Sequence, residues 1–225
     1  MFKFPKSSYV KTLLGMAGVA TLACSLAHAS SVSLPDPVLD EPRAQTQGPE
    51  TVVLSGGCFW GIQLVYQHVK GVTQAVSGYA GGEAPTAHYD MVSTGTTGHA
   101  ESVQVTYDPS QVTLGQLLKV FFTVAHDPTQ INQQSPDHGP QYRSAVFSTT
   151  PEQQKIADAY IAQLDQTHVF SKPIATKVGP LKAFYAAEDY HQNYATLHPD
   201  NFYIAAMDLP KAKALQEQFP QLYVK

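Results

Sequence analysis

The hydrophobic and polar positions divide the chain into alternating strand-like and helix-like stretches. Residues 51–54 form a short apolar run that predicts a buried strand, and a Ser-Gly-Gly turn follows it. From Cys58 the apolar positions recur at helical spacing, which predicts a helix beginning there. Residues 72–77 have the composition of a second strand. Residues 103–107 alternate between apolar and polar, so we expect a third strand with Glu101 at its start.

Two later helices begin with capping signals. Thr113 and Gln116 form a capping box ahead of an apolar helical pattern. Pro151 stands at the first position of a second helix, where its missing N–H is tolerated. The remaining predicted elements are strands at residues 144–148 and 174–178 and a short helix at residues 210–218.

This order of strands and helices predicts an α/β (α+β) fold with a two-layer split βαβ, ferredoxin-like core. Two long stretches, residues 78–98 and 127–142, show no regular period. Loops of this length are uncommon in compact domains unless they serve a function. We therefore expect both to be active-site loops.

The first 29 residues have the three parts of a secretory signal. Three lysines give a positive start, residues 12–26 form an uncharged apolar run, and residues 27–29 (Ala-His-Ala) supply small residues for cleavage. The apolar run is too short for a comfortable membrane span, so we expect cleavage near Ala29 and a periplasmic or otherwise exported protein. Lipid anchoring at Cys24 is less favoured, because the leucine expected three places before such a cysteine is absent.

Cleavage would change both the charge and the boundaries of the protein. The whole chain has 225 residues and a net charge of −4, and residues 1–29 carry three lysines and no acid. The mature chain would therefore have 196 residues and a charge of −7, which argues against nucleic-acid binding. Residues 30–50 contain four prolines and no hydrophobic period, so we expect a disordered linker there. The catalytic domain would span residues 51–225, with no transmembrane helix in the mature protein.

Cys58 is the candidate reactive group. Signal cleavage would remove Cys24, the one other cysteine, and leave an unpaired thiol in an oxidising compartment. Cys58 follows two glycines at an expected helix start, where backbone N–H groups favour the thiolate. Phe59 and Trp60 come next, and aromatic faces beside sulfur suit a small apolar group such as a methyl. A buried structural cysteine beside two core aromatics is the alternative interpretation.

Five short segments between residues 51 and 201 stand in the order of a known family. They are GGCFWG at residues 56–61, GYAGG at 78–82, TGHAE at 97–101, DHGPQYRS at 137–144 and EDYHQ at 188–192. Together they resemble peptide-methionine (S)-S-oxide reductase, the methionine sulfoxide reductase A family. Several matches at long spacing are more specific than one motif.

The resemblance implies reduction of the S epimer of methionine sulfoxide, in proteins and as the free amino acid, through a cysteine sulfenic acid. Cys58 would attack the sulfoxide sulfur, and Glu101 would protonate the departing oxygen. Tyr89 and Tyr142 would donate hydrogen bonds to that oxygen. The other implied site residues are Phe59 and Trp60, which would bind the ε-methyl group, and Asp137, which would hydrogen-bond to backbone or water.

The sequence departs from the family in its tail. Many members carry further cysteines there that resolve the sulfenic acid, and residues 205–225 contain none. We therefore expect no bound cofactor and an external thiol reductant, such as a thioredoxin-type dithiol protein. Oxidised proteins carrying methionine sulfoxide would be the other partners, in protein repair under oxidative stress. The sulfenic acid would persist longer and be more exposed to overoxidation.

Other functions remain open from the residues alone. A cysteine-dependent acyl transferase or hydrolase would pair Cys58 with a distant histidine, and a binding module would hold methionine sulfoxide without turnover. Taken singly, Glu101, Tyr89 and Asp137 also fit ordinary surface or turn positions. His191 and Tyr190 fit either the rim of a site or the core. The histidines lack the spacing of a zinc site, so no metal is expected.

Overall fold

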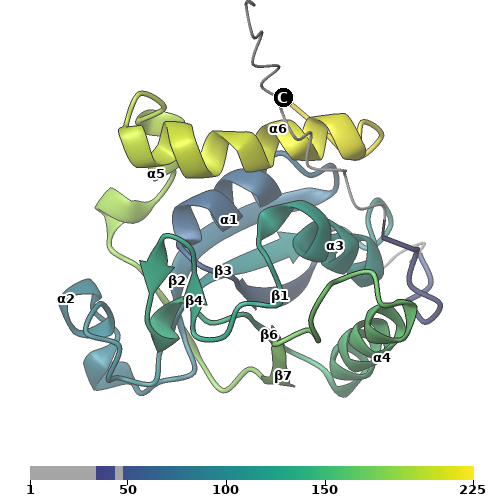
Figure 1. Ribbon diagram of the computed structural model, residues 1–225, viewed down its shortest axis with the longest axis horizontal. Helices are drawn as coiled ribbons and strands as arrows, with labels where there is room; N and C mark the ends of the chain where they lie inside the picture. The colour runs from purple at the N-terminus through teal and green to yellow at the C-terminus, as the bar shows by residue number, and fades with distance from the viewer. Residues whose placement is uncertain (1–33, 44–47) are drawn as a thin grey trace, which may run out of the picture. The chain divides into compact units, whose positions relative to one another are not determined.

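A six-stranded mixed sheet forms the centre of the described chain, in the order β7-β6-β1-β3-β2-β8. Figure 1 labels these strands except β8. The computed structural model describes residues 34–43 and 48–225. The predicted signal sequence and Cys24 therefore lie outside the described residues. The strands of the sheet are β1 (Glu50–Ser55), β2 (Val72–Ala80), β3 (Ala100–Tyr107), β6 (Ala145–Ser148), β7 (Lys177–Pro180) and β8 (Phe184–Ala186).

The four central strands form the split βαβ core that the sequence predicts. Helix α1 (Phe59–Gln67) joins β1 to β2, and these two strands flank β3, which is antiparallel to both. In the same way β3 and β6 flank β1, and α3 (Leu114–Val120) lies on the connection between them. Two interleaved βαβ units of this kind make a ferredoxin-like core. The predicted fold class is confirmed.

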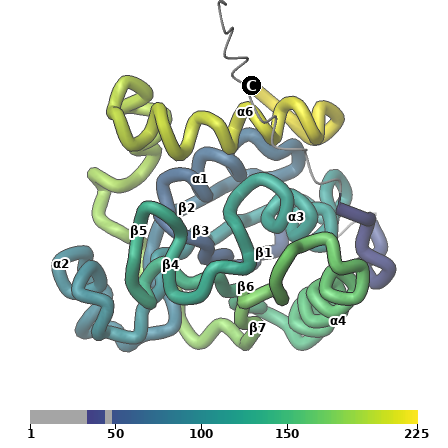
Figure 2. The backbone as a smooth tube through the Cα atoms, in the orientation of Figure 1, coloured from purple at the N-terminus to yellow at the C-terminus, as the bar shows by residue number. Residues whose placement is uncertain are grey.

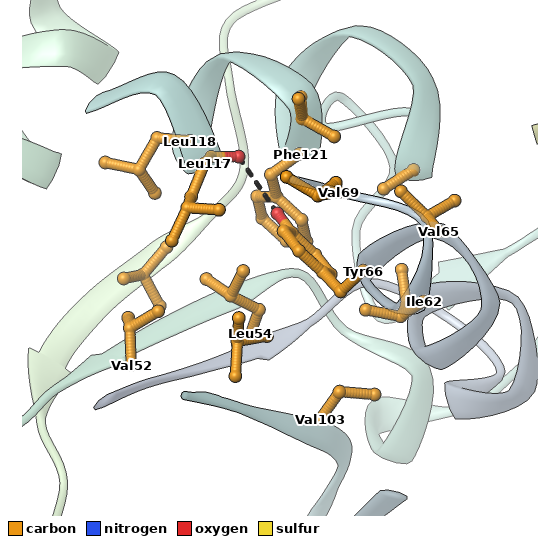
Figure 3. Packing of buried hydrophobic residues seen from close by; sticks show 14 of the residues in the cluster. Val52, Leu54, Ile62, Val65, Tyr66, Val69, Val103, Leu117, Leu118 and Phe121 are labelled. Carbon is orange, nitrogen blue, oxygen red and sulfur yellow. Dashed lines mark hydrogen bonds between the residues drawn. The ribbon is translucent and has the colours of Figure 1, made fainter. Parts of the chain in front are cut away.

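One face of the sheet packs against α1 and α3 (Figure 3). Val52 and Leu54 alternate along β1 with Val53, so the first two join this core, and all three are buried. Tyr66 of α1 lies at the centre, and its hydroxyl donates a hydrogen bond to the carbonyl of Leu117 at 2.9 Å. This bond satisfies the polar atom of an otherwise apolar cluster. The other labelled members are Ile62, Val65, Val69, Val103, Leu118 and Phe121.

The sheet is strongly curled. Five gaps between six flat strands would separate β7 from β8 by about 24 Å. Four steps along the chain join Pro180, the last residue of β7, to Phe184, the first of β8, and they span at most ~14 Å. The two edges must therefore approach one another, which brings the ends of distant strands together around the site.

The predicted helix starts are confirmed. Both halves of the capping box between Thr113 and Gln116 are formed at the start of α3. Helix α4 (Pro151–Thr167) begins with Pro151, and the hydroxyl of Thr150 accepts from the N–H of Gln153 at 3.1 Å. The predicted final helix is α6 (Leu209–Gln218), which packs with α5 (Tyr194–Leu197) against α1 (Figure 1). No helix in the described ranges is long and apolar enough to cross a membrane.

Two predicted loops contain short elements. The first includes a 3₁₀ turn (Ala84–Thr86) and α2 (Tyr89–Val92). The second folds into a small hairpin of β4 (Gln133–Gln134) and β5 (Asp137–His138), visible as a separate pair in Figure 2. These elements are too short to produce a hydrophobic period.

The prediction of a disordered linker is wrong for residues 34–43. Leu34 is buried in the main core, and the hydroxyl of Tyr160 on α4 donates to the carbonyl of Pro35 at 2.8 Å. Asp40 accepts hydrogen bonds from the N–H of Gly115 at 2.8 Å and from the hydroxyl of Thr113 at 2.5 Å. Residues 34–43 therefore form a strap that connects α3 to α4. The prolines that suggested disorder instead favour the extended path of this strap.

Candidate functional site

Cys58 lies at the turn between β1 and α1. Gly57 has φ = +97°, a left-handed conformation that favours glycine, and Cys58 is the residue before the first turn of α1. This is the strand–turn–helix arrangement that the sequence predicts. Cys58 is 9% exposed, so its thiol lies just below the surface.

The resting charge of Cys58 differs from the prediction. Burial raises the pKa of the thiol well above its usual range, and the charges of Glu101 and Asp208 act in the same direction. The backbone N–H of Trp60 lowers the pKa, as expected at a helix start, and so does Lys211. Burial outweighs both, so the resting group is the thiol.

Glu101 is a buried carboxylic acid beside Cys58. It follows Ala100 at the start of β3, and its Oε2 accepts a hydrogen bond from the N–H of Phe59 at 3.1 Å. That bond ties the acid to the residue next to Cys58. Burial raises the pKa of Glu101 to about 8 although the bond from Phe59 lowers it. Below this pH the group is neutral and can donate a proton.

Tyr89 and Tyr142 come from the two predicted loops and meet near Glu101. Tyr89 opens α2, and Tyr142 ends a 3₁₀ turn (Pro140–Tyr142). Burial raises the pKa of each phenol, and the charges of Glu101 and Cys58 raise both further. Both hydroxyls therefore stay protonated and can donate hydrogen bonds at neutral pH.

Asp137, the first residue of β5, also belongs to this cluster. Its Oδ2 accepts a hydrogen bond from the hydroxyl of Tyr203, so a side chain takes the place of the expected backbone or water partner. The charge of Asp137 helps to raise the pKa of both Glu101 and Tyr142. Asp137 therefore links the small hairpin to the C-terminal segment and favours the neutral form of Glu101.

Phe59 and Trp60 form an aromatic wall with residues far along the chain. The ring of Trp60 stacks on Tyr194 with centroids 3.9 Å apart and planes at 12°. Tyr203 meets Trp60 edge-on at 6.3 Å, and Phe59 lies 5.0 Å from His191. Such a wall, next to a sulfur nucleophile, suits an apolar methyl group.

His191 is part of this wall. Its Nδ1 accepts a hydrogen bond from the indole N–H of Trp60 at 3.2 Å, and its ring lies 4.5 Å from that of Tyr89. Burial lowers the pKa of His191, so the ring is neutral. Its neighbour Tyr190 is 61% exposed and lies at the rim. The structure thus separates two residues whose positions the sequence left open.

Arg143 joins the two loops that carry the acid and one tyrosine. Its guanidinium donates to the carbonyls of Gly98 at 2.9 Å and His99 at 3.0 Å, just before Glu101. It also donates to the carbonyl of Pro140 at 2.9 Å, two residues before Tyr142. The planar fork of arginine suits this arrangement of three acceptors.

The sequence interpretation missed several residues that shape the site. Glu188 accepts from the N–H of Tyr89 and from the hydroxyl of Tyr79, both at 2.9 Å, and so fixes α2. The fully buried Asp208 pairs with Lys211 at 3.0 Å. Its carboxylate lies against Gly61 of α1, where a larger side chain would collide with it. These residues, with Tyr194 and Tyr203, lie between 188 and 211 at irregular spacing, and only the segment at 188–192 gave a signal.

A metal centre is not supported by the side chains in residues 34–43 and 48–225. No three His, Cys, Asp or Glu side chains in these ranges gather closely enough to hold an ion. The arrangement instead joins one thiol, one neutral acid, two phenols and an aromatic wall. These groups can attack an electrophilic atom, protonate its leaving oxygen and hold an apolar substituent.

Comparison with known proteins gives one consistent result. A family model described as "Peptide methionine sulfoxide reductase" matches residues 50–223. The chain is 55% identical over 185 residues to peptide methionine sulfoxide reductase MsrA 2 of Mesorhizobium japonicum, covering 82% of this chain and 94% of the relative. It is 50% identical over 188 residues to MsrA 2 of Synechocystis sp., covering 83% and 88%.

Solved structures agree with the sequence comparisons. Reduced Mxr1 from Saccharomyces cerevisiae superposes with a TM-score of 0.63 at 34% identity, over 68% of this chain and 88% of that one. Methionine sulfoxide reductase A of Corynebacterium diphtheriae gives a TM-score of 0.59 at 36% identity, over 74% and 83%.

Proposed function

Since the chain belongs to the peptide methionine sulfoxide reductase family, we propose that Cys58 and Glu101 together carry out its reaction. The protein is an oxidoreductase that reduces methionine sulfoxide, and its partners are oxidised proteins. The alternative of a cysteine-dependent acyl transferase or hydrolase finds no support in this family membership. The remaining question is how the described residues perform the reduction.

In the proposed reaction the sulfur of Cys58 attacks the sulfur of the sulfoxide. Glu101 gives its proton to the sulfoxide oxygen and afterwards takes up the proton of the thiol. The S–O bond of the substrate breaks, and an S–O bond forms at Cys58. Two electrons pass from the cysteine sulfur to the methionine sulfur. The products are methionine and a sulfenic acid on Cys58, so atoms and protons balance.

One observation carries this proposal: a buried, neutral acid is tied to the backbone beside the only thiol in the described chain. The N–H of Phe59 holds Glu101 at 3.1 Å, and the pKa of Glu101 is about 8. A proton donor is thus available where the oxygen must leave. Tyr89 and Tyr142 supply protonated hydroxyls that stabilise the charge on that oxygen.

The same site supports a choice of epimer. The aromatic wall of Phe59 and Trp60 receives the ε-methyl, while Glu101 and the phenols face the oxygen. A sulfoxide sulfur is a stereocentre, so fixing methyl and oxygen leaves only one epimer able to present its sulfur to Cys58. We propose the S epimer, which the resemblance to the methionine sulfoxide reductase A family implies.

A single-turnover assay tests the function. Reductant-free enzyme should release one methionine per Cys58 from the S epimer in peptides and in the free amino acid, and Cys58→Ser should release none. Reduction of the R epimer alone would refute the assignment of epimer. Binding without release of methionine would show a binding module instead.

Regeneration and location complete the proposal. With no cysteine in residues 205–225, we propose that an external dithiol protein of thioredoxin type reduces the sulfenic acid, with no bound cofactor. We also propose export with cleavage after Ala29, on the basis of the signal pattern in the sequence. N-terminal sequencing of the exported protein should find Ser30 as its first residue. Retention of Cys24 with an attached lipid would refute the cleavage site.

A further inference from the structure

Strand β2 has an open edge over half of its length. On one side it pairs with β3 from Val72 to Ala80. On the other side β8 pairs with only three of its residues, 78–80, and the N–H of Ala187 then donates to the carbonyl of Ser77 at 2.9 Å. In the part of the chain that the structure describes, no strand continues β8 along residues 72–76. Such an edge is a template for an extended peptide.

A groove of about 510 Å³ lies where β8 would continue. Residues 72–76 form one wall, and amide side chains of α1 and of the segment after β8 form the other. Asp189 is the one charged residue of the lining, so the groove favours neither an anion nor a strongly charged segment. The amide residues in the lining are Gln63, Gln67, Gln74, Gln192 and Asn193.

Side chains in this groove already imitate a neighbouring strand. Gln192 accepts from the N–H of Ser77 at 3.0 Å and donates to its carbonyl at 2.9 Å. Gln63 donates to the carbonyl of Ala75 at 3.0 Å. Because backbone groups alternate along a strand, the peptide groups of Ser77 and Ala75 point toward the same side. These bonds already occupy both peptide groups of Ser77 and the carbonyl of Ala75, so an added strand would pair with the remaining outward groups of residues 73–75 and with the amide side chains.

The groove lies beside the proposed site for methionine sulfoxide and is separated from it by one short segment of the chain. Residues 188–193 form a wall between the two. On the inner side His191 contacts Phe59 and Tyr89, with ring centroids 5.0 and 4.5 Å apart. On the outer side the next residue, Gln192, lines the groove. A polypeptide whose side chain reaches the aromatic wall needs to cross only this short segment to reach the open edge.

We propose that this groove binds the extended main chain that flanks methionine sulfoxide in an oxidised protein, adding a short strand to the edge of β2. The inference rests on the proposed function. Recognition through backbone groups does not depend on the flanking sequence. A repair enzyme that meets methionine sulfoxide in many sequence contexts requires this tolerance.

Peptide length tests the proposal. Two peptides carry four extra residues, one before and one after the methionine sulfoxide. For the peptide whose extra residues enter the groove, we expect kcat/KM to be about 5–10-fold higher than for the blocked amino acid, from one or two added hydrogen bonds. N-methylation of the flanking backbone should remove this gain while leaving the side chains intact. A gain that survives N-methylation at every flanking position would refute main-chain recognition.

A groove-filling variant provides the second test. Gln74 is exposed and lines the groove, and Gln74→Trp should abolish the gain for peptides while the blocked amino acid reacts as before. Gln166→Trp, at an exposed position of α4, is the matched control and should behave as wild type. Equal loss for both substrates, or a loss only toward the dithiol reductant, would overturn the proposal. Failure of wild type to reduce the blocked amino acid would instead refute the proposed function.

Discussion

Burial holds Glu101 and Cys58 in protonation states that suit the start of the reaction. In water at pH 7 a glutamate is ionised, whereas here burial raises the pKa of Glu101 to about 8. The same burial keeps Cys58 as a thiol. The pair therefore begins with both protons present, and the reaction moves one of them to the sulfenic acid. Removing the acid should change the rate, its pH dependence and the stability of the protein.

Glu101→Gln should lower the single-turnover rate by roughly 10²–10⁴-fold, since it removes a general acid. In wild type the rate should be level below about pH 8, where the thiol of Cys58 and neutral Glu101 are both present, and should fall above that pH as Glu101 loses its proton. In Glu101→Gln the break near pH 8 should disappear, and rapid-quench assays across the pH range would measure this. A break that remains in the variant would show that another group causes it.

Glu101→Gln should also stabilise the folded protein at alkaline pH. The folded-state pKa of Glu101, about 8, lies above its usual value of 4.5. The stability that protonated Glu101 contributes is therefore fully present below pH 4.5 and is lost as pH rises through 8. At pH 7 the penalty is on the order of 3 kcal/mol. Urea unfolding should show the variant more stable than wild type at pH 8 and nearly equal at pH 4. A variant less stable at pH 8 would contradict this.

Which site residues could be predicted depended on the range of their contacts. Cys58, Phe59 and Trp60 are adjacent, and a glycine turn before a helix is visible in the sequence. Tyr203 could not be predicted, because its contacts with Trp60 and Asp137 join segments that are far apart in the chain. The charge state of Cys58 was also hidden, since it depends on the depth of burial and not on local spacing.

Among the elements, the two loops of the site are coupled by Arg143. The geometry predicts that Arg143→Met lowers kcat about 10–100-fold, because loss of three hydrogen bonds lets Glu101 and Tyr142 move relative to Cys58. KM should change less, since the aromatic wall is untouched. Steady-state assays would measure kcat and KM separately, with the exposed Lys182→Met as control. A change confined to KM would argue against this role.

The strap of residues 34–43 should contribute to the stability of α3. Asp40 accepts from the N–H of Gly115 and the hydroxyl of Thr113 at the start of that helix. Asp40→Ala should lower the free energy of unfolding by about 1 kcal/mol, the usual effect of losing such a cap. Urea unfolding would measure it, with the exposed Asp158→Ala on α4 for comparison. Equal stability of the two variants would show that the strap is only loosely attached.

Elements with their own signals were predicted, and those that depend on other elements were not. The capping box at Thr113 and the proline at 151 are local and gave α3 and α4. Strand β8 has three residues, too few for alternation, and exists because it pairs with β2. The strap was misread for a related reason: its hydrogen-bond partners on α3 and α4 lie about 75 or more residues away, although its own composition suggests a linker.

For the whole molecule, the decisive fact is that the described residues hold one thiol, that of Cys58, for a catalytic cycle that needs two. Residues 30–225 contain no second cysteine, so under the proposed cleavage after Ala29 an outside thiol would have to reduce the sulfenic acid on Cys58. Cys58 lies at a turn and the residue is 9% exposed, so a reductant can approach it from the surface. The reductant must therefore approach over the same loops that admit the substrate.

Mass spectrometry of the exported chain after one turnover should show one added oxygen atom at Cys58 and no internal disulfide. A dithiol reductant whose second cysteine is replaced by serine should then form a stable mixed disulfide with Cys58, because the resolving thiol of the reductant is missing. Cys58→Ser is the control and should form none. A disulfide between Cys24 and Cys58 in the exported protein would contradict both signal cleavage and external resolution, since the first cysteine is present only in an uncleaved chain.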